Sequence, residues 1–258
     1  MDFASVVTAL LGLSLIDLLL ICLAAVVAGT ARGFSGFGGA LIFVPLASAI
    51  IGPKVATPLL LVIDGLMTLG MIPAAWHRAN RREVFTMAAG ALVGVPAGVA
   101  VLTLTPSIGV RWMICGIVVV LLAFLISGWR YHGTPKAWLT VAVGGLAGLF
   151  GGAAQLSGPP VVAYWLGGAF PAQTVRANLV LYFAVSTVIS AIALIAAGLL
   201  SVQVLLIALA AGPAYGLGIF LGSRLFGFAP ESTFRWICFA LIGCAAVISL
   251  PLLDAIRP

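Results

Sequence analysis

Apolar residues in this chain follow one another in long runs instead of alternating with polar ones. The runs cover residues 15–31, 40–51, 55–75, 84–104, 110–128, 137–150, 159–169, 174–198, 202–224 and 235–252. A helix needs about 20 apolar residues to cross a bilayer, so the longer runs predict transmembrane helices. The runs at 15–31, 40–51, 137–150 and 159–169 are short for complete crossings, and together they predict two broken elements.

A glycine-rich stretch lies inside each broken element. The first is GFSGFGGALIFVP at residues 33–45, and the second is GGLAGLFGGAAQLSGPP at residues 144–160. Backbone groups left without hydrogen bonds in a membrane cost several kcal/mol each. Broken helices are therefore expected around a polar cavity, where their free N-termini can hold an anion. The pattern predicts a transporter built around two facing breaks.

Composition supports a membrane protein. Hydrophobic residues make up 63% of the 258 residues, charged residues 7%, and the mean hydropathy is +1.29. Globular proteins have about 25% charged residues. We therefore predict an all-α polytopic membrane protein with one transmembrane domain, residues 1–258. The net charge of +6 is attributed to Lys and Arg retained in cytoplasmic loops and not to nucleic-acid binding.

Cysteines and the N-terminus add little to this picture. The four cysteines lie in apolar runs without a CxxC pair, as expected of small packing residues: Cys22, Cys115, Cys238 and Cys244. The first residues, MDFASVV, are acidic where a secretory signal is basic, so we expect the first apolar run to be retained.

The chain also repeats itself. KVATPLLLV at residues 54–62 aligns with TVRANLVLY at residues 174–182, an offset of 120 that also places Gly98 on Gly218. Further on, Arg111-Trp112 aligns with Arg235-Trp236 at an offset of 124. We predict two homologous halves, about 15–132 and 133–253, each with one broken or re-entrant element and three transmembrane helices.

Basic residues predict the topology. If each broken element returns to its side of entry, most Lys and Arg share one face, and the halves are inverted with both termini outside. That face would carry Arg78, Arg81, Arg82, Arg130, Lys136, Arg176, Arg224 and Arg235, opposed by Lys54, Arg111 and Arg257. If each element crosses once, Arg176, Arg224 and Arg235 move to the far side. The positive-inside bias favours the first arrangement, although two short crossings per element would give the same sidedness.

Small residues at four-residue spacing predict close helix packing. The spacing occurs at Gly90, Gly94 and Gly98, at Gly212 and Gly216, and at Gly218 and Gly222. Such ladders let two backbones approach in a membrane, where no hydrophobic force drives helices together. Packing is the favoured interpretation, and a rocking motion is the alternative.

These motifs resemble the TauE/SafE family of sulfite and organosulfonate exporters. The resemblance is carried by GFSGFGGALIFVPL followed by PKVATPLLL, and by GLFGGAAQLSGPPVVAYWLGG followed by RANLVLYF, and it covers essentially the whole chain. The second glycine motif has SGPPVV where many members have GxGGG before the proline. The resemblance implies export of small sulfur-containing anions such as sulfite or sulfoacetate.

An oxyanion inside the bundle needs oriented N–H groups or cations to replace its hydration. Each helix N-terminus supplies about half a positive charge, and glycine leaves its N–H groups accessible. The predicted cradle comprises Gly36, Gly38 and Gly39 at the first break and Gly151, Gly152, Gln155, Ser157 and Gly158 at the second. The alternative is that these glycines only bend or pack the backbone.

Charged and polar residues near the breaks are further candidates. Arg176 stands in an apolar helix, where its guanidinium can grip two oxygens of an anion or snorkel to the interface. Asn178 and Tyr182 share a helix face four residues apart, and Arg32 directly precedes the first glycine run. Asp64 is the one acid in the middle of a long run, and it is predicted to carry a coupling proton or to balance an arginine.

Two classes of function remain after these observations. A secondary carrier in the cytoplasmic (inner) membrane fits the paired breaks, and an anion channel or a membrane scaffold is the alternative. The chain has no HExxH and no GxxxxGK[ST], so we expect no enzyme, cofactor, metal or ATP hydrolysis. The expected partners are a small anion, lipid and, as an option, a second copy of the chain. Glu83 is expected to pair with Arg81 or Arg82.

Overall fold

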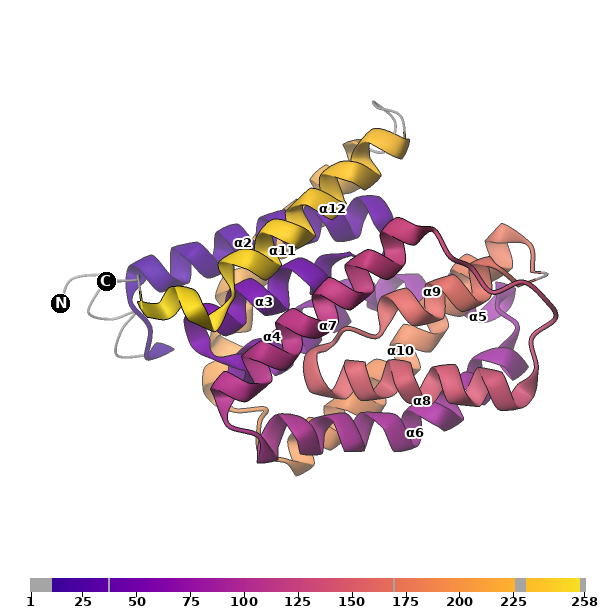
Figure 1. The fold of residues 1–258 in the computed structure, drawn as a ribbon, viewed down its shortest axis with the longest axis horizontal. Helices are drawn as coiled ribbons and strands as arrows, with labels where there is room; N and C mark the ends of the chain where they lie inside the picture. The colour runs from indigo at the N-terminus through magenta and orange to yellow at the C-terminus, as the bar shows by residue number, and fades with distance from the viewer. Residues whose placement is uncertain (1–10, 37, 169, 226–230, 256–258) are drawn as a thin grey trace. The chain divides into compact units, whose positions relative to one another are not determined.

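A computed structural model describes the chain except residues 1–10, 37, 169, 226–230 and 256–258, which include Arg257. The described residues form helices and no strand (Figure 1). The elements are α2 (Leu15–Ser35), α3 (Gly39–Ile51), α4 (Pro53–Thr68), η1 (Leu69–Met71), α5 (Ile72–Arg78), α6 (Arg81–Leu104), α7 (Ser107–Ser127), α8 (Ala137–Ala154), α9 (Gly158–Leu166), α10 (Ala172–Ala196), α11 (Val202–Leu225), α12 (Glu231–Ile248) and η2 (Pro251–Ala255).

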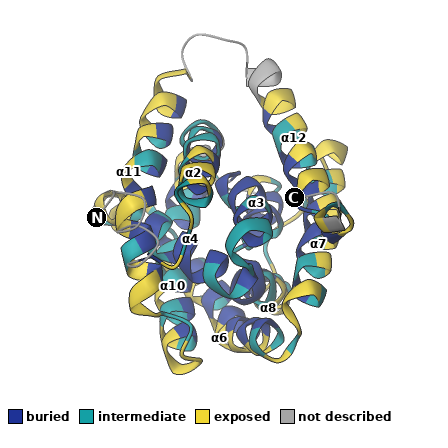
Figure 2. Cartoon of the chain, turned by 90° about the vertical axis from the view of Figure 1, so that its left-hand side faces the viewer, coloured by how far each residue is buried: buried dark blue, intermediate teal, exposed yellow. Residues whose placement is uncertain are grey.

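Seven helical segments of the described chain are long and apolar enough to cross a membrane. Their outer faces carry large apolar side chains, such as Leu104, which is 85% exposed, while residues between helices are buried (Figure 2). This exposure suits lipid and not water. Together the helices make the predicted polytopic membrane protein.

The lengths of the helices beside the breaks correct one expectation. α2 and α8 both qualify as complete spans, whereas α3 and α9 are short. The prediction that all four flanking segments are short was therefore wrong for the first segment of each break. The apolar runs underestimated α2 and α8 because their last turns contain arginine or glycine, which the helices include.

The described chain divides into two compact units. Unit 1 comprises residues 1–63, 106–122 and 199–258, and unit 2 comprises residues 64–105 and 123–198. Each unit contains one break and elements from both predicted halves. The division into halves at 15–132 and 133–253 stays a prediction.

In unit 1, α2 packs in parallel against α11 along a glycine seam. A Cβ added at Gly218 would lie 2.3 Å from the Val26 carbonyl oxygen, and one at Gly222 would lie 2.1 Å from that of Thr30. On the facing helix, a Cβ at Gly33 would lie 2.2 Å from the Ile219 oxygen. Since real Cβ atoms do not approach backbone this closely, only glycine fits at these three positions.

Unit 2 contains a matching seam between α6 and α8, which also run in parallel. A Cβ at Gly94 would lie 2.1 Å from the Gly145 oxygen, and one at Gly98 would lie 2.2 Å from the Leu149 oxygen. The predicted packing role is confirmed at Gly90, Gly94, Gly98, Gly218 and Gly222. It was wrong for Gly212, where no described atom lies within 4 Å of an added Cβ.

Helix starts in unit 2 come together at one end. The Asn80 side chain caps α6, and its backbone N–H donates to the Asn178 side-chain oxygen of α10 at 2.7 Å. The Thr140 hydroxyl of α8 donates to the Glu83 carboxylate of α6 at 3.4 Å. Six basic residues in the segments beside these helix starts have exposed side chains: Arg78, Arg81, Arg82, Arg130, Lys136 and Arg176.

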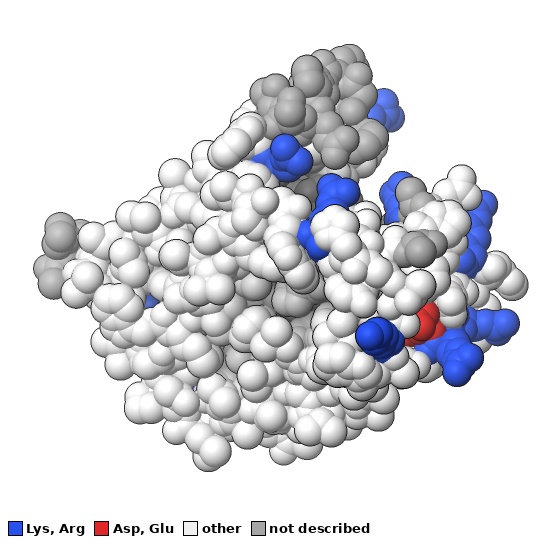
Figure 3. Space-filling model, turned by 45° about the vertical axis from the view of Figure 1, so that its right-hand side comes forward, with Lys and Arg blue, Asp and Glu red and all other residues white. Residues whose placement is uncertain are grey.

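Figure 3 shows Lys and Arg side chains gathered near an acidic one. The Asn80–Asn178 contact places the start of α10, with Arg176, beside residues 78–82. This agrees with the re-entrant arrangement, which predicts Arg176 on the same face as Arg78, Arg81 and Arg82. The expected pairing of Glu83 with Arg81 or Arg82 was wrong within the described chain, because Thr140 contacts Glu83 and the Arg81 guanidinium lies 5.5 Å from the centre of the Trp76 ring.

Candidate functional site

The first break separates α2 from α3 in unit 1. α2 ends at Gly36, whose φ of 81° and ψ of −7° are left-handed, and the Gly36 N–H donates to the Arg32 carbonyl oxygen at 2.8 Å. The Arg32 guanidinium donates to the Gly36 carbonyl oxygen. Gly38 then precedes the first residue of α3, Gly39. Arg32 thus caps the end of α2 with a positive charge, where the helix dipole favours one.

The second break separates α8 from α9 in unit 2. α8 ends at Gln155, which has a φ of 58° and is the one described non-glycine residue with positive φ. Its backbone N–H and its side-chain Nε2 both donate to the Gly151 oxygen, at 2.8 and 3.1 Å. This hydrogen bonding holds a conformation that is strained for glutamine.

The predicted second cradle begins too early in the sequence. Gly151 and Gly152 lie inside the last turn of α8 and are buried. A Cβ at Gly152 would lie 2.1 Å from the Val95 carbonyl oxygen, so Gly152 belongs to the α6–α8 seam. The break itself starts at Gln155.

The two breaks have similar backbone dihedrals at two pairs of positions 119 residues apart. Gly36 and Gln155 are both left-handed helix ends. Gly38 and Ser157, which precede the next helix, have φ, ψ of −74°, −12° and −71°, −15°. A similar local fold therefore forms from different side chains.

The breaks differ in the N–H groups that they offer. α3 begins with Gly39, Ala40 and Leu41, each of which carries a backbone N–H that has no partner within the helix. α9 begins with Gly158 and continues with Pro159 and Pro160, which have no N–H. Only the first break has a complete set of amides at its helix start.

Tyr215 of α11 lies beside the first break. A Cβ added at Gly39 would lie 2.8 Å from the Tyr215 hydroxyl oxygen, and Tyr215 is buried. Sequence reasoning missed this residue because it sits in a packing helix far from the glycine motif. Its polar group among the glycines of GPAYGLG was the available signal.

In unit 2, three buried side chains on α9 and α10 carry donors without acceptors. Trp165 Nε1, Asn178 Nδ2 and Tyr182 Oη have no hydrogen-bond partner among the described residues. All three side chains are fully buried, and the Trp165 and Tyr182 rings meet edge to face with centroids 5.9 Å apart. Ser186, one turn beyond Tyr182 on α10, lies near the Tyr182 hydroxyl but makes no hydrogen bond to it.

Leaving a buried donor unsatisfied costs about 1–3 kcal/mol. Asn178 and Tyr182 were predicted site residues; Tyr182 packs against Trp165, which was not predicted, and Asn178 lies one turn before Tyr182 on α10. The sequence feature that could have pointed to Trp165 was its polar indole N–H within a helix of nine residues that follows a break.

The charged candidates lie apart from these donors. Arg176 is exposed near the start of α10, four residues after Ala172. Asp64 is half-buried in α4, where its carbonyl oxygen accepts from the Thr68 hydroxyl at 3.0 Å. A ligand role for Arg176 and a coupling role for Asp64 stay predictions.

A family comparison identifies the kind of protein. The family model for the sulfite exporter TauE/SafE matches residues 21–249 and so spans both breaks and both seams. The chain belongs to the TauE/SafE family. At the level of this family it is a multi-pass transporter for sulfite and related sulfur anions. No curated protein and no solved structure matches the chain significantly.

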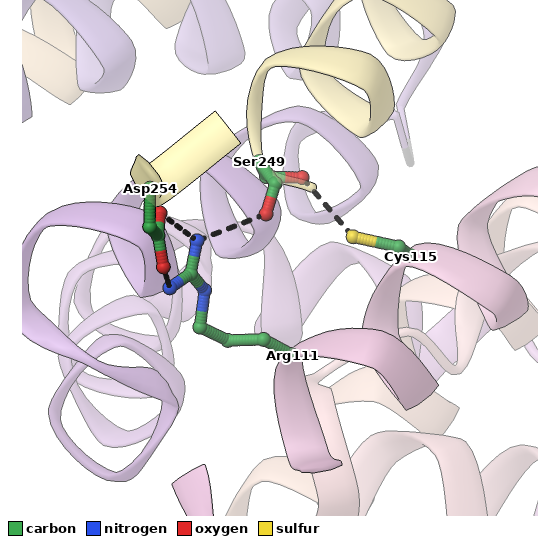
Figure 4. A network of polar contacts seen from close by, with 4 residues as sticks. All are labelled: Arg111, Cys115, Ser249 and Asp254. Carbon is green, nitrogen blue, oxygen red and sulfur yellow. Dashed lines mark hydrogen bonds and ion pairs between the residues drawn. The ribbon is translucent and has the colours of Figure 1, made fainter. Parts of the chain in front are cut away.

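Unit 1 of this TauE/SafE protein also holds a polar network away from the first break (Figure 4). The Arg111 guanidinium of α7 binds both carboxylate oxygens of Asp254 in η2 and donates to the Ser249 carbonyl oxygen at 3.1 Å. The Cys115 sulfur lies 3.3 Å from the Ser249 hydroxyl. The network ties α7 to the end of α12, and sequence analysis gave no indication of a pair separated by 143 residues.

Proposed function

We propose that this protein is a secondary carrier that exports sulfite, sulfoacetate or a related organosulfonate across the cytoplasmic membrane. Family membership supports a sulfur anion as the cargo. The observation that carries the proposal is the pair of helix breaks with matching backbone geometry, at Gly36–Gly38 and Gln155–Ser157. Broken helices are the usual means by which carriers expose backbone donors inside a membrane.

At the first break, the donors suit an oxyanion. The free amides at the start of α3 add to a helix dipole worth about half a positive charge. The Arg32 guanidinium adds a full charge at the end of α2, next to the same break. These groups can replace part of the hydration that the anion loses.

Arg176 and Asp64 have separate proposed roles. Arg176 is exposed among the basic residues at one end of unit 2, so it can attract an anion from water and grip two of its oxygens. Asp64 is the one carboxylate in the apolar segment Pro53–Arg78, where protonation lowers the cost of burial. We assign proton coupling to Asp64.

Counterflow in proteoliposomes tests the proposal. Vesicles loaded with unlabelled sulfite should accumulate labelled sulfite against its gradient, and sulfoacetate should compete. A proton uncoupler should abolish gradient-driven transport in wild type and should have no effect on Asp64→Asn, whose exchange persists. Flux without counterflow would establish a channel, and the absence of any anion flux would favour a scaffold.

A further inference from the structure

The three unsatisfied donors of unit 2 lie on α9 and α10, which contact each other. We propose that Trp165, Asn178 and Tyr182 form a binding site dominated by donors for an oxyanion group whose oxygens carry no hydrogen, such as a sulfonate or fully ionised sulfite. The inference rests on the proposed function and names the side chains of unit 2 that recognise the cargo, with Trp165 at the end of α9 that lies away from the second break. Pro159 and Pro160 leave the start of α9 short of amides, so unit 2 relies on side-chain donors where unit 1 has the amides of α3.

Hydrogen bonding fixes the orientation of Asn178. The Asn80 N–H needs an acceptor, so the Asn178 amide turns its oxygen toward Asn80, at 2.7 Å. The NH2 group then points away, and it is the atom without a partner among the described residues. Asn178 therefore presents donors only, and the indole of Trp165 has no acceptor to offer.

The Trp165 N–H, the Asn178 NH2 and the Tyr182 hydroxyl make no hydrogen bond within the described chain, whereas the Asn178 oxygen binds Asn80. In the repeat alignment at an offset of 120, Pro58 and Val62 stand where Asn178 and Tyr182 do, and at the offset of 119 that relates the breaks, Leu46 stands where Trp165 does. Apolar residues thus occupy the corresponding positions in the first half of the predicted repeat. Buried donors without acceptors reduce stability, so retaining three of them indicates a ligand.

The donors predict that the site prefers anions whose oxygens carry no hydrogen over anions that keep an O–H group. A sulfonate accepts at every oxygen, whereas a phosphate group below its second pKa of about 6 keeps a P–OH that needs an acceptor. The two groups have similar shapes, but Trp165 and the Asn178 NH2 cannot accept from P–OH, which leaves the Tyr182 hydroxyl as the single acceptor for it. Because all three side chains are fully buried, the anion reaches them only when α9 and α10 move apart.

Sulfite counterflow in proteoliposomes tests the site with variants that remove one donor each. Trp165→Phe and Tyr182→Phe keep most of the ring volume, and Asn178→Asp keeps the oxygen that faces Asn80. Each of the first two should raise the KM for sulfite about tenfold, and Asn178→Asp should raise it further through charge repulsion. Trp138→Phe and Tyr131→Phe, on exposed or half-buried rings, are matched controls with wild-type KM.

Thermal unfolding in detergent separates binding from folding. Without anion, Tyr182→Phe should unfold at or above the wild-type temperature, because it deletes an unsatisfied donor. Methanesulfonate should stabilise wild type but not this variant, while phosphate at pH 5 should stabilise neither. Wild-type KM and anion stabilisation in all three variants would overturn the site.

The two proposals fail in different ways. A wild-type protein that shows no anion flux would refute the carrier. If methanesulfonate still stabilised that protein through Trp165, Asn178 and Tyr182, the binding site would stand alone. A carrier with normal counterflow in every variant would keep its function and lose this site.

Discussion

The two helix breaks have nearly the same backbone and different chemistry. The first is built from glycines, keeps the amides at the start of α3 and is capped by the charge of Arg32. The second holds Gln155 in a left-handed conformation, loses two amides to proline and lies in a unit with three unsatisfied side-chain donors. The comparison teaches that helix breaks with similar backbone geometry can differ in how many backbone N–H groups they leave unbonded at the next helix start.

The seams that support the breaks should be equally intolerant of side chains. Gly94→Val in unit 2 and Gly218→Val in unit 1 each place a Cβ within 2.3 Å of a carbonyl oxygen. Each should destabilise the protein by about 3 kcal/mol or more, seen as loss of a monodisperse peak in size-exclusion chromatography. Gly212→Val, which faces open space, is the control. If only one of the two seam variants lost stability, the two seams would not be equivalent.

Arg111 and Arg235, which correspond in the repeat alignment, should contribute differently to stability. Arg111→Gln removes the ion pair with Asp254, whose carboxylate is 40% exposed, and should lower stability by about 1–2 kcal/mol in thermal unfolding. Arg235→Gln changes an exposed residue and should leave the unfolding temperature unchanged. A double-mutant cycle with Asp254→Asn should show coupling for Arg111; additive effects would refute the pair.

Substitutions at the two left-handed helix ends, Gly36 and Gln155, should change the stability of the protein by different amounts. Gly36→Ala meets no steric clash, so its cost of about 1–2 kcal/mol comes from conformation alone. Gln155→Gly relieves strain and loses one hydrogen bond, so its net effect on stability should stay within about 1 kcal/mol. Gly116→Ala, in α7 with open space around it, controls for added volume in thermal unfolding. Equal losses for both would contradict the comparison.

Restoring an amide to the second break should make it resemble the first. Pro160→Ala adds one N–H at the start of α9 and should lower the KM for sulfite counterflow about two- to threefold, a net hydrogen bond of about 0.5 kcal/mol. Pro106→Ala, at the exposed start of α7, should leave the KM unchanged. An unchanged or higher KM for Pro160→Ala would show that the α9 amides do not face the anion.

The sequence predicted the helices and breaks because local composition determines both. Apolar length sets the spans, and glycine and proline mark where helices end. The loss of amides at Pro159 and Pro160 was also readable from the sequence. Gln155 was predicted as a donor, but its left-handed backbone was not, since glutamine gives no local sign of it.

Contacts between distant segments could not be predicted. The ladders at Gly90–Gly98 and Gly218–Gly222 indicated packing, but not that α6 pairs with α8 and α2 with α11. Trp165 was missed because nothing in the sequence shows whether an indole N–H finds an acceptor. That question depends on which helices meet, and so did the pairing of Arg111 with Asp254.

Selenite, a heavier analogue of sulfite, offers the most direct test of anion binding at the breaks. Anomalous scattering from crystals of the selenite complex would locate the selenium atom. The account predicts selenium one Se–O bond beyond hydrogen-bond distance from the amides at the start of α3, or from Trp165 Nε1, Asn178 Nδ2 and Tyr182 Oη, so that selenite oxygens accept from these donors. Selenium bound elsewhere, with both of these donor sets unoccupied, would contradict it.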